Sequence, residues 1–238
     1  MKTVIRVLLT ASLLALPASP LLAQTAGPSG HWEGSLQAGP TIVPIEVDLG
    51  TNAKGDLAGT FGQPEQQVKG LPLSMVAASG TSVRFVLHGN AGPATFDGTL
   101  AADGQWIRGE ASQGGNVMPF TLKRTGDARF APAPKSTRIG PELEGTWSGM
   151  MDVGGRAERL VLKLANQADG TAAGTVVDRD GSGVEIPIGI TQKGASVTID
   201  IPSVGGVYAA VLNAGAEMVG TWSQATVSLP LTFQRVSK

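Results

Sequence analysis

Cysteine is absent from this sequence of 238 residues, and histidine occurs only twice. Without thiols the chain has no disulfide, no thiolate zinc site, no iron–sulfur cluster and no cysteine nucleophile. A Ser-His-Asp triad would have to use His31 or His88, and neither lies at a sharp strand-to-helix turn. Two histidines also fall short of the usual zinc ligand set. We therefore expect no catalytic residue, no metal site and no cofactor.

Charged residues are also scarce, at 16% of the chain with a net charge of −1. A nucleic-acid-binding protein normally carries a concentrated basic surface, so the sequence predicts no nucleic-acid partner. Glycine and proline are abundant instead, at 33 and 15 residues. That composition is typical of many short strands joined by tight turns.

The first residues have the layout of a secretory signal peptide. Lys2 and Arg6 precede an apolar run over 7–16, and a small residue, Ala23, follows two prolines. The run is too short to span a bilayer, which needs roughly 20 apolar residues. We predict a signal peptide at 1–23, a short mature segment at 24–29, and a periplasmic or secreted protein with no membrane span after cleavage.

An internal repeat organises the rest of the chain. The sequence GHWEG at 30–34 returns as GTWSG at 145–149, which is 115 residues later. Near the ends of the two copies, MPFTLKR at 118–124 returns as LPLTFQR at 229–235. The repeat predicts two copies of one domain, at 30–125 and 143–238, with a partly extended linker at 126–142.

Apolar residues alternate with polar ones at period two, in the same phase in both copies. Ile45, Val47 and Leu49 match Leu160, Leu162 and Leu164; Val83, Phe85 and Leu87 match Val197, Ile199 and Ile201; Phe120 and Leu122 match Leu231 and Phe233. This alternation predicts strands with one buried face. About eight strands per copy are expected, in the first copy beginning near Trp32, Ile42, Leu57, Val68, Val83, Ala94, Trp106 and Val117. The predicted fold is all-β, as two tandem eight-stranded antiparallel up-and-down barrels or curled meanders, and two β-sandwiches fit the same alternation.

The Gly-x-Trp opening of each copy, combined with an Arg in its last strand, resembles the lipocalin and avidin-like barrels. That resemblance implies that Trp32 packs with Arg124, and Trp147 with Arg235, to close one end of each barrel. A flat guanidinium can stack on an indole while its N–H groups reach backbone carbonyl oxygens.

The second copy, from Trp-x-Gly through GTWSQ to LPLTFQR, also resembles the accessory β-domain that precedes the catalytic domain of many secreted bacterial α/β-hydrolases. The first copy resembles it less closely. This chain contains no Gly-x-Ser-x-Gly motif, and only 236–238 follow the LPLTFQR segment that ends the likeness. The esterase or peptidase activity of that family is therefore not carried over.

Trp106, Tyr208 and Trp222 are the candidate ligand-binding residues, because their aromatic rings could stack on a sugar or line an apolar pocket. These aromatic residues are not matched between the copies, and such unmatched positions are where the two copies could have specialised. Core or interface packing is the alternative interpretation.

Asp178, Asp180 and Glu185 form a second candidate group, able to bind a hard cation through oxygen. Their spacing differs from that of the twelve-residue calcium loop. A solvated hairpin tip fits the spacing better.

Two functional hypotheses make the protein a non-enzyme, and hydrolytic activity itself is a third, weaker one. The first is an exported module that binds an unidentified partner protein, and a link to a separate hydrolase is a weaker form of it. The second is a lipocalin-like carrier of a small apolar ligand. The copies are short for ligand-carrying barrels, so we expect interiors mostly filled by their own side chains, with no large internal cavity. A carried ligand would then bind in a barrel mouth or between the copies.

Overall fold

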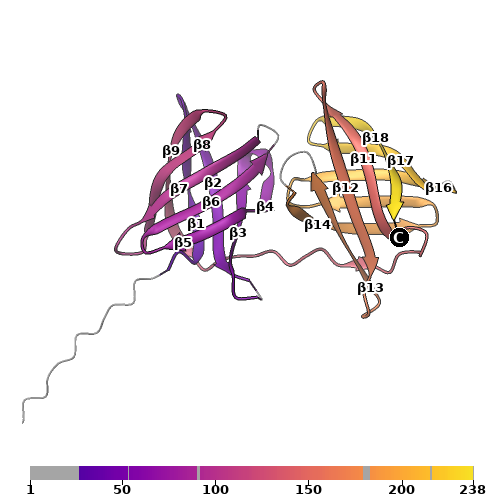
Figure 1. Cartoon of the computed structure of the whole chain (residues 1–238), viewed down its shortest axis with the longest axis horizontal. Helices are drawn as coiled ribbons and strands as arrows, with labels where there is room; N and C mark the ends of the chain where they lie inside the picture. The colour runs from indigo at the N-terminus through magenta and orange to yellow at the C-terminus, as the bar shows by residue number, and fades with distance from the viewer. Residues whose placement is uncertain (1–26, 53, 90–91, 179–182, 215, 238) are drawn as a thin grey trace, which may run out of the picture.

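Two β-barrels lie side by side in the computed structural model, joined by one extended segment (Figure 1). The structure describes residues 27–52, 54–89, 92–178, 183–214 and 216–237. Within these ranges there is no α-helix, and no helix is long and apolar enough to cross a membrane. The first barrel contains β1 (Gly30–Ala38), β2 (Thr41–Thr51), β3 (Leu57–Gln63), the 3₁₀ turn η1 (Pro64–Gln66), β4 (Val68–Pro72), β5 (Ser74–Ser79), β6 (Ser82–Gly89), β7 (Gly92–Leu100), β8 (Trp106–Gln113) and β9 (Asn116–Gly126). The second contains β11 (Gly145–Val153), β12 (Arg156–Asn166), β13 (Thr171–Asp178), β14 (Glu185–Lys193), β15 (Ser196–Ile201), β16 (Gly206–Asn213), β17 (Glu217–Gln224) and β18 (Val227–Ser237).

The second barrel is a closed, eight-stranded antiparallel meander. Each strand from β11 to β18 pairs with the next, and β18 pairs back onto β11. The first barrel follows the same order, but the strand that corresponds to β14 is broken into β4 and β5. Leu73 lies at the break, where its N–H donates a hydrogen bond of 2.9 Å to the carbonyl oxygen of Gly59. The prediction of two tandem barrels is confirmed, and the extra strand in the first copy was not predicted.

Strand register follows the sequence repeat closely. Trp32 lies opposite Arg124 in the first barrel, and Trp147 lies opposite Arg235 in the second. Thr60 pairs with Pro72, and in the second barrel the pair 115 positions later is Thr175 with Pro187. Residues matched by sequence therefore occupy the same places in the two barrels.

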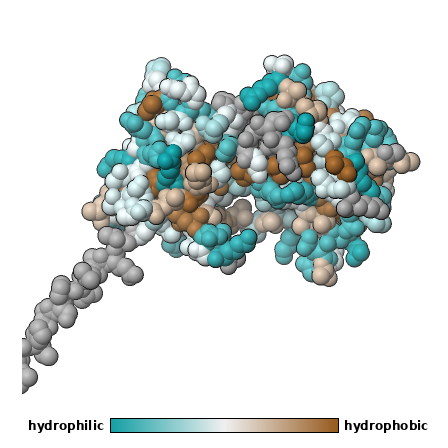
Figure 2. Space-filling view, in the orientation of Figure 1, coloured by the Kyte–Doolittle hydropathy of each residue, from teal (hydrophilic) through white to brown (hydrophobic). Residues whose placement is uncertain are grey.

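The inward face of the strands is apolar, as the alternation predicted. In β2 the buried residues Ile45, Val47 and Leu49 flank Glu46 and Asp48, which lie on the other face of the sheet. Of the phase-matched apolar residues identified in the sequence, all except the half-buried Leu87 are buried. Hydrophilic side chains cover much of the visible outer surface, with smaller apolar patches between them (Figure 2).

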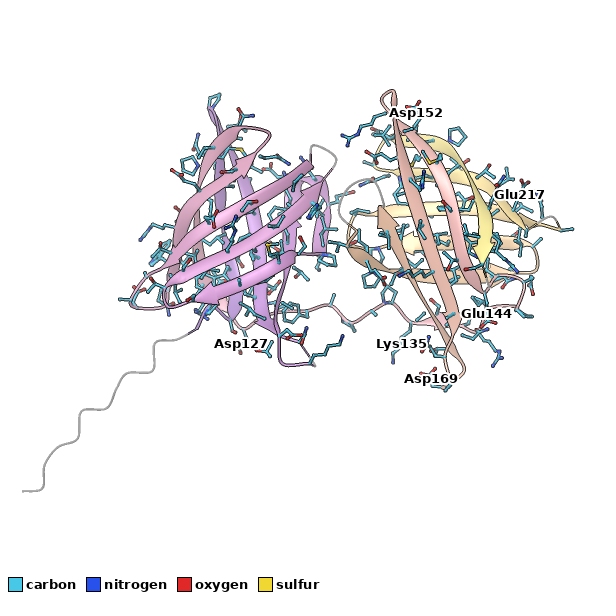
Figure 3. The ribbon with its side chains drawn as sticks, in the orientation of Figure 1. Asp127, Lys135, Glu144, Asp152, Asp169 and Glu217 are labelled. Carbon is cyan, nitrogen blue, oxygen red and sulfur yellow. The ribbon has the colours of Figure 1, made fainter. Side chains whose placement is uncertain are left out.

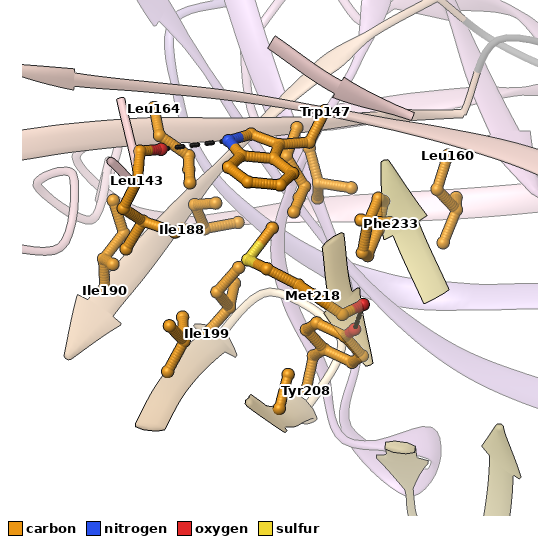
Figure 4. Close-up of a cluster of buried hydrophobic side chains, with 14 of the residues drawn as sticks. Leu143, Trp147, Leu160, Leu164, Ile188, Ile190, Ile199, Tyr208, Met218 and Phe233 are labelled. Atoms are coloured by element: carbon orange, nitrogen blue, oxygen red, sulfur yellow. Dashed lines mark hydrogen bonds between the residues drawn. The ribbon is translucent and has the colours of Figure 1, made fainter. Parts of the chain in front are cut away.

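The two cores differ in their side chains. The first is built on four phenylalanines, with the Phe85 and Phe96 rings stacked at 4.7 Å and the Phe96 and Phe120 rings edge to face at 5.3 Å. Phe61 completes this group at 6.2 Å from Phe96. The second core is mainly aliphatic around Tyr208, Met218 and Phe233 (Figure 4).

The segment predicted as a linker takes part in the second barrel. It forms the short strand β10 (Ser136–Thr137), which pairs with β13. The backbone N–H of Ile190 donates a hydrogen bond of 2.7 Å to the buried Oγ of Ser136. Ile139 and Leu143 are buried in the core of the second barrel. No core role was predicted for either residue.

The barrels also contact each other directly. The backbone N–H of Lys69 in β4 donates a hydrogen bond of 2.8 Å to the carbonyl oxygen of Ser203, in the loop between β15 and β16. Gln67, after η1, lies beside Gly205 of the same loop. One side of the first barrel therefore meets one end of the second.

Candidate functional site

One end of each barrel is closed by a tryptophan and an arginine. The Arg124 guanidinium carbon lies 4.4 Å from the ring centroid of Trp32, and that of Arg235 lies 4.7 Å from the ring centroid of Trp147. Both indoles are fully buried. These are the contacts that the resemblance to lipocalin and avidin-like barrels implied.

Arg124 also ties the strand ends to the residues that precede the first barrel. Its guanidinium donates to the carbonyl oxygens of Gly104 at 2.8 Å, Gly27 at 2.7 Å and Ser29. Burial lowers the pKa of the guanidinium, and the nearby carboxylate of Asp127 opposes that shift. Because its donors are engaged by backbone carbonyls, this residue is a structural clamp.

The three candidate aromatic residues do not form one site. Tyr208 is 1% exposed, and its one hydroxyl hydrogen is shared between the backbone carbonyl oxygens of Met218 and Leu231, which lie 2.8 and 3.0 Å from the hydroxyl oxygen. It therefore belongs to the core of the second barrel, in agreement with the alternative interpretation. Trp222 is half-buried and lines an apolar pocket of that barrel. Trp106 lies in the other barrel.

Trp106 is a half-buried side chain in β8, next to the inward-facing Ile107. The guanidinium carbon of Arg108 lies 4.9 Å from its ring centroid, and the Lys123 ammonium lies 5.7 Å from it. Trp106 lines neither the pocket beside Trp222 nor the hollow between the two barrels. Its ring is occupied by cations of its own barrel rather than exposed to a ligand.

The pocket beside Trp222 lies at the open end of the second barrel, opposite the end closed by Trp147. Figure 3 marks the two ends, with Asp152 at the open end and Glu144 and Asp169 at the closed end. The pocket has a volume of about 510 Å³, within the range of about 300–1,000 Å³ typical of small-molecule sites. Its wall is largely apolar, formed by inward-facing side chains that include Met151, Leu160, Val176, Ile186, Ile201 and Trp222. Glutamine and glutamate side chains complete it, namely Gln66, Glu158 and Gln224.

Side-chain size explains why this end is hollow. Val176 of β13 occupies the place that Phe61 of β3 occupies in the first barrel, and the smaller side chain leaves the upper layer unfilled. Trp222 stands where the first barrel has Ala111, and it forms one wall of the space without filling it. The second barrel is thus hollow at its mouth, which is one of the two places expected for a carried ligand, while the rest of its interior holds the apolar core.

A second hollow of about 350 Å³ lies between the two barrels. It borders Phe61, Leu87 and His88 of the first barrel. It shares four lining residues with the first pocket: Gln66, Ile186, Val204 and Gln224. A hollow between the copies, the other place left open for a carried ligand, therefore exists and adjoins the pocket in the second barrel.

His31 forms a polar cluster that the sequence analysis missed. It is 4% exposed, with Nδ1 2.8 Å from Oδ1 of Asp48 and Nε2 3.2 Å from Oε1 of Glu33. The backbone N–H of Arg129 donates to the same Asp48 oxygen at 2.7 Å. Because both ring nitrogens face carboxylates, His31 is not placed to activate a serine or threonine hydroxyl. The signal that could have revealed this cluster is the pairing of β1 with β2. It places His31 opposite Asp48, with both side chains on the outer face of the sheet.

No group of three or more histidine and acidic side chains is arranged to hold a metal ion in the part of the chain that the structure describes. Of the candidate cation ligands in the β13–β14 hairpin, Asp180 lies outside the described residues, as does the side chain of Asp178. The remaining ligand, Glu185, contacts Lys163 and accepts a hydrogen bond of 3.2 Å from Thr175. The predicted signal peptide at 1–23 also lies outside the described residues.

No protein-family model and no curated protein matches this chain. Two solved structures show similarity at low identity. One is a Bacteroides fragilis protein provisionally described as an outer membrane protein, with 11% identity and a TM-score of 0.29, covering 87% of this chain and 95% of that one. The other is a Nostoc punctiforme protein of unknown function from the DUF3598 family, with 12% identity and a TM-score of 0.24, covering 87% and 96%. Such low TM-scores support no inference about function, and the likeness to hydrolase accessory domains stays a prediction.

Proposed function

We propose that this chain is an exported, non-catalytic binding protein that holds a small apolar ligand in the open end of its second barrel. The observation that supports this most is the pocket of about 510 Å³ walled by inward-facing apolar side chains. Burying apolar ligand surface there stabilises a complex by about 25 cal/mol per Å² before the costs of association. Export is inferred from the signal-peptide pattern at the start of the sequence.

A difference between the interiors of the two barrels supports the same proposal. The first barrel fills its interior with phenylalanine rings, whereas the second replaces Phe61 by Val176 and keeps a hollow at the same level. The first barrel places Gln66 at the rim of that hollow and forms the backbone hydrogen bond from Lys69 to Ser203 beside it. We infer that the second barrel holds the ligand and the first covers one side of the entrance.

A neutral polarity-sensitive dye, Nile red, tests the proposal directly. The mature protein is expected to bind the dye with increased dye emission and altered tryptophan fluorescence, because Trp222 lines the pocket. Val176→Phe restores the ring present in the first barrel and is expected to abolish binding. Val207→Phe is the matched control, because Val207 is a valine on the outer face of β16.

Circular dichroism on both variants separates lost binding from lost folding. Failure of the wild-type protein to bind Nile red or any member of a panel of apolar dyes and lipids would remove the proposal. Equal loss of binding in the two folded variants would place the dye elsewhere.

The partner-protein hypothesis keeps one structural observation in its favour. Val211 of β16 and Val219 of β17 lie opposite each other on the outer face, at 49% and 46% exposed. Replacing both valines by lysine should reduce the amount of partner protein captured from an envelope extract, compared with the amount captured by the wild-type protein used as bait. Equal recovery by both baits would argue against this surface.

A further inference from the structure

Four side chains with hydrogen-bonding groups line the hollow of about 350 Å³ between the two barrels. Gln63, Gln66 and His88 belong to the first barrel, and Gln224 belongs to the second. The other described residues in this wall are apolar or glycine, so the described wall contains no carboxylate, lysine or arginine. The hollow therefore offers donors and acceptors in apolar surroundings, without a fixed charge.

The three polar side chains from the first barrel are not engaged by other described residues. Gln63 directly precedes η1, but its side chain makes no hydrogen bond that caps this turn. Within the described part of the chain, the side chains of Gln66 and His88 also have no hydrogen-bond partner. Polar groups beside a hollow that lack a protein partner bond to water or to a ligand. These side chains are therefore available to a molecule that enters the hollow.

The hollow and the apolar pocket of the second barrel share part of their walls, including Gln66 and Gln224. The Nε2 of Gln224 donates to the carbonyl oxygen of Val204 at 3.0 Å, which leaves the amide oxygen of Gln224 as an acceptor at this boundary. A ligand whose apolar body fills the pocket can thus extend its other end past these amides into the hollow. The polar end of such a ligand would lie among the uncharged groups from the first barrel.

Resting on the function proposed above, we infer that the ligand is an amphiphile with an uncharged, hydroxyl-bearing head, such as a monoacylglycerol. Its acyl chain contacts the apolar wall beside Val176 and Trp222, and its head binds the amides of Gln63 and Gln66 in the hollow. A hydroxyl group both donates and accepts, as a primary amide does, so the two match without any charge. A charged head would lose water beside walls whose described residues supply no fixed opposite charge, and it is selected against.

Two esters of one acyl chain, dodecanoylglycerol and methyl dodecanoate, test this inference because they differ only in the hydroxyl-bearing part of the head. Their affinities are measured by displacement of Nile red at mildly alkaline pH, which favours the neutral imidazole, and below the concentrations at which they self-associate. A site that only buried apolar surface would favour the methyl ester, because hydroxyls without partners cost free energy on leaving water. We expect the glycerol ester to bind at least about fivefold more tightly. Dodecanoate, with the same chain and an anionic head, should bind more weakly than the glycerol ester.

Leucine substitutions locate the head. Gln63→Leu combined with Gln66→Leu should reverse the preference between the two esters while methyl dodecanoate still binds. Gln66→Leu alone, at an exposed position of η1, should reduce the preference by at least about twofold. Gln105→Leu is the matched control, because Gln105 is an exposed amide that lines neither the pocket nor the hollow, and it should keep the wild-type preference.

The possible results distinguish the inference from the proposed function. A wild-type protein that binds methyl dodecanoate or dodecanoate as tightly as dodecanoylglycerol would overturn the inference and leave the proposed function standing. A preference for the glycerol ester that persists unchanged in the folded leucine variants would do the same. Failure of both esters and of Nile red to bind would overturn the inference and the proposed function together.

Discussion

Trp147 donates its indole N–H to the backbone carbonyl oxygen of Leu143 over 2.9 Å, four residues before it in the chain (Figure 4). Trp32 makes the same bond to Pro28, also at 2.9 Å. Leu143 lies 115 positions after Pro28, which is the offset of the sequence repeat. The structural repeat thus includes the residues that lead into each first strand, and these residues form the closed end of each barrel.

The arginine clamp at this end should dominate the stability of the first barrel. Arg124→Met removes the stacking on Trp32 and the hydrogen bonds to Gly104, Gly27 and Ser29. The carbonyl oxygens left without donors make the change cost about 2–3 kcal/mol of unfolding free energy. Urea unfolding followed by tryptophan fluorescence measures this loss.

Arg108→Met is the control for the clamp. Arg108 also stacks on an indole, at 4.9 Å from the Trp106 centroid, but its side chain is on the exposed face of β8. Its loss should cost under about 1 kcal/mol. Similar costs for the two substitutions would show that stacking alone, and not the backbone hydrogen bonds, accounts for the role of Arg124.

Tyr208 should make the protein sensitive to alkaline pH. Burial raises the pKa of its phenol, so the hydroxyl stays protonated in the folded state at pH values where an unfolded tyrosine ionises. Above about pH 10 the unfolded state loses this proton first, and the unfolding free energy falls by about 1.4 kcal/mol per pH unit from this group alone. Because the chain has one tyrosine, tyrosinate absorbance reports Tyr208 directly.

Tyr208→Phe isolates that contribution. The first barrel has Phe96 at the corresponding place, so the prediction that Tyr208 is unmatched between the copies is wrong, and a phenyl ring should fit. The variant loses the hydrogen bonds to Met218 and Leu231, and it should be less stable by about 1–2 kcal/mol below pH 10. The difference from the wild type should then shrink as pH rises. A constant difference up to the alkaline unfolding limit would contradict the account.

The repeat and the period-two alternation carried enough information to predict the strands and the buried face, and the resemblance to lipocalin and avidin-like barrels implied the Trp–Arg pairs. Those features depend on local residue patterns that occur in both copies. The break between β4 and β5 was not predictable, because it depends on Leu73 hydrogen-bonding back to Gly59 and on the positive φ of Met75. Nothing in the residue types at these positions signals either feature.

The pocket depends on side chains from seven strands stacking in one layer, so it could not be predicted from any single segment. The exchange of Phe61 for Val176 was visible in the aligned copies. Predicting that this exchange leaves a pocket would have required knowing that no other side chain fills the lost volume. Glu158 lies two residues before Leu160, where the buried apolar alternation of β12 begins, and Arg156 before it is exposed, so no apolar pattern placed this acid on the inward face.

Matched glycines at Gly109 and Gly220 should be intolerant of substitution. A Cβ at either position would collide with a backbone carbonyl oxygen of the neighbouring strand, from Asp97 and Ala209 respectively. Backbone cannot move aside as a side-chain tip can, so alanine should cost about 1–3 kcal/mol at each site. Gly89→Ala in β6 meets no atom nearby and should stay within about 0.5 kcal/mol of the wild type. Thermal unfolding of the three variants compares them, and an equally mild effect at all three would show that the strands can separate locally.

Asp48 should control whether the segment after β9 stays docked on the first barrel. One oxygen of its carboxylate accepts from the backbone N–H of Arg129 and contacts the buried ring of His31, while Phe130 packs over Gly50 nearby. Asp48→Ala leaves the His31 ring and the Arg129 N–H without this partner, at a cost of about 1–3 kcal/mol. Hydrogen exchange should accelerate over 127–131, the first part of the connection between the barrels. Asp97→Ala removes an exposed carboxylate that pairs with Arg84 at 3.4 Å, and it should leave exchange in that segment unchanged. If exchange over 127–131 is already fast in the wild type, or does not respond to Asp48→Ala, the carboxylate does not hold the connecting segment in place.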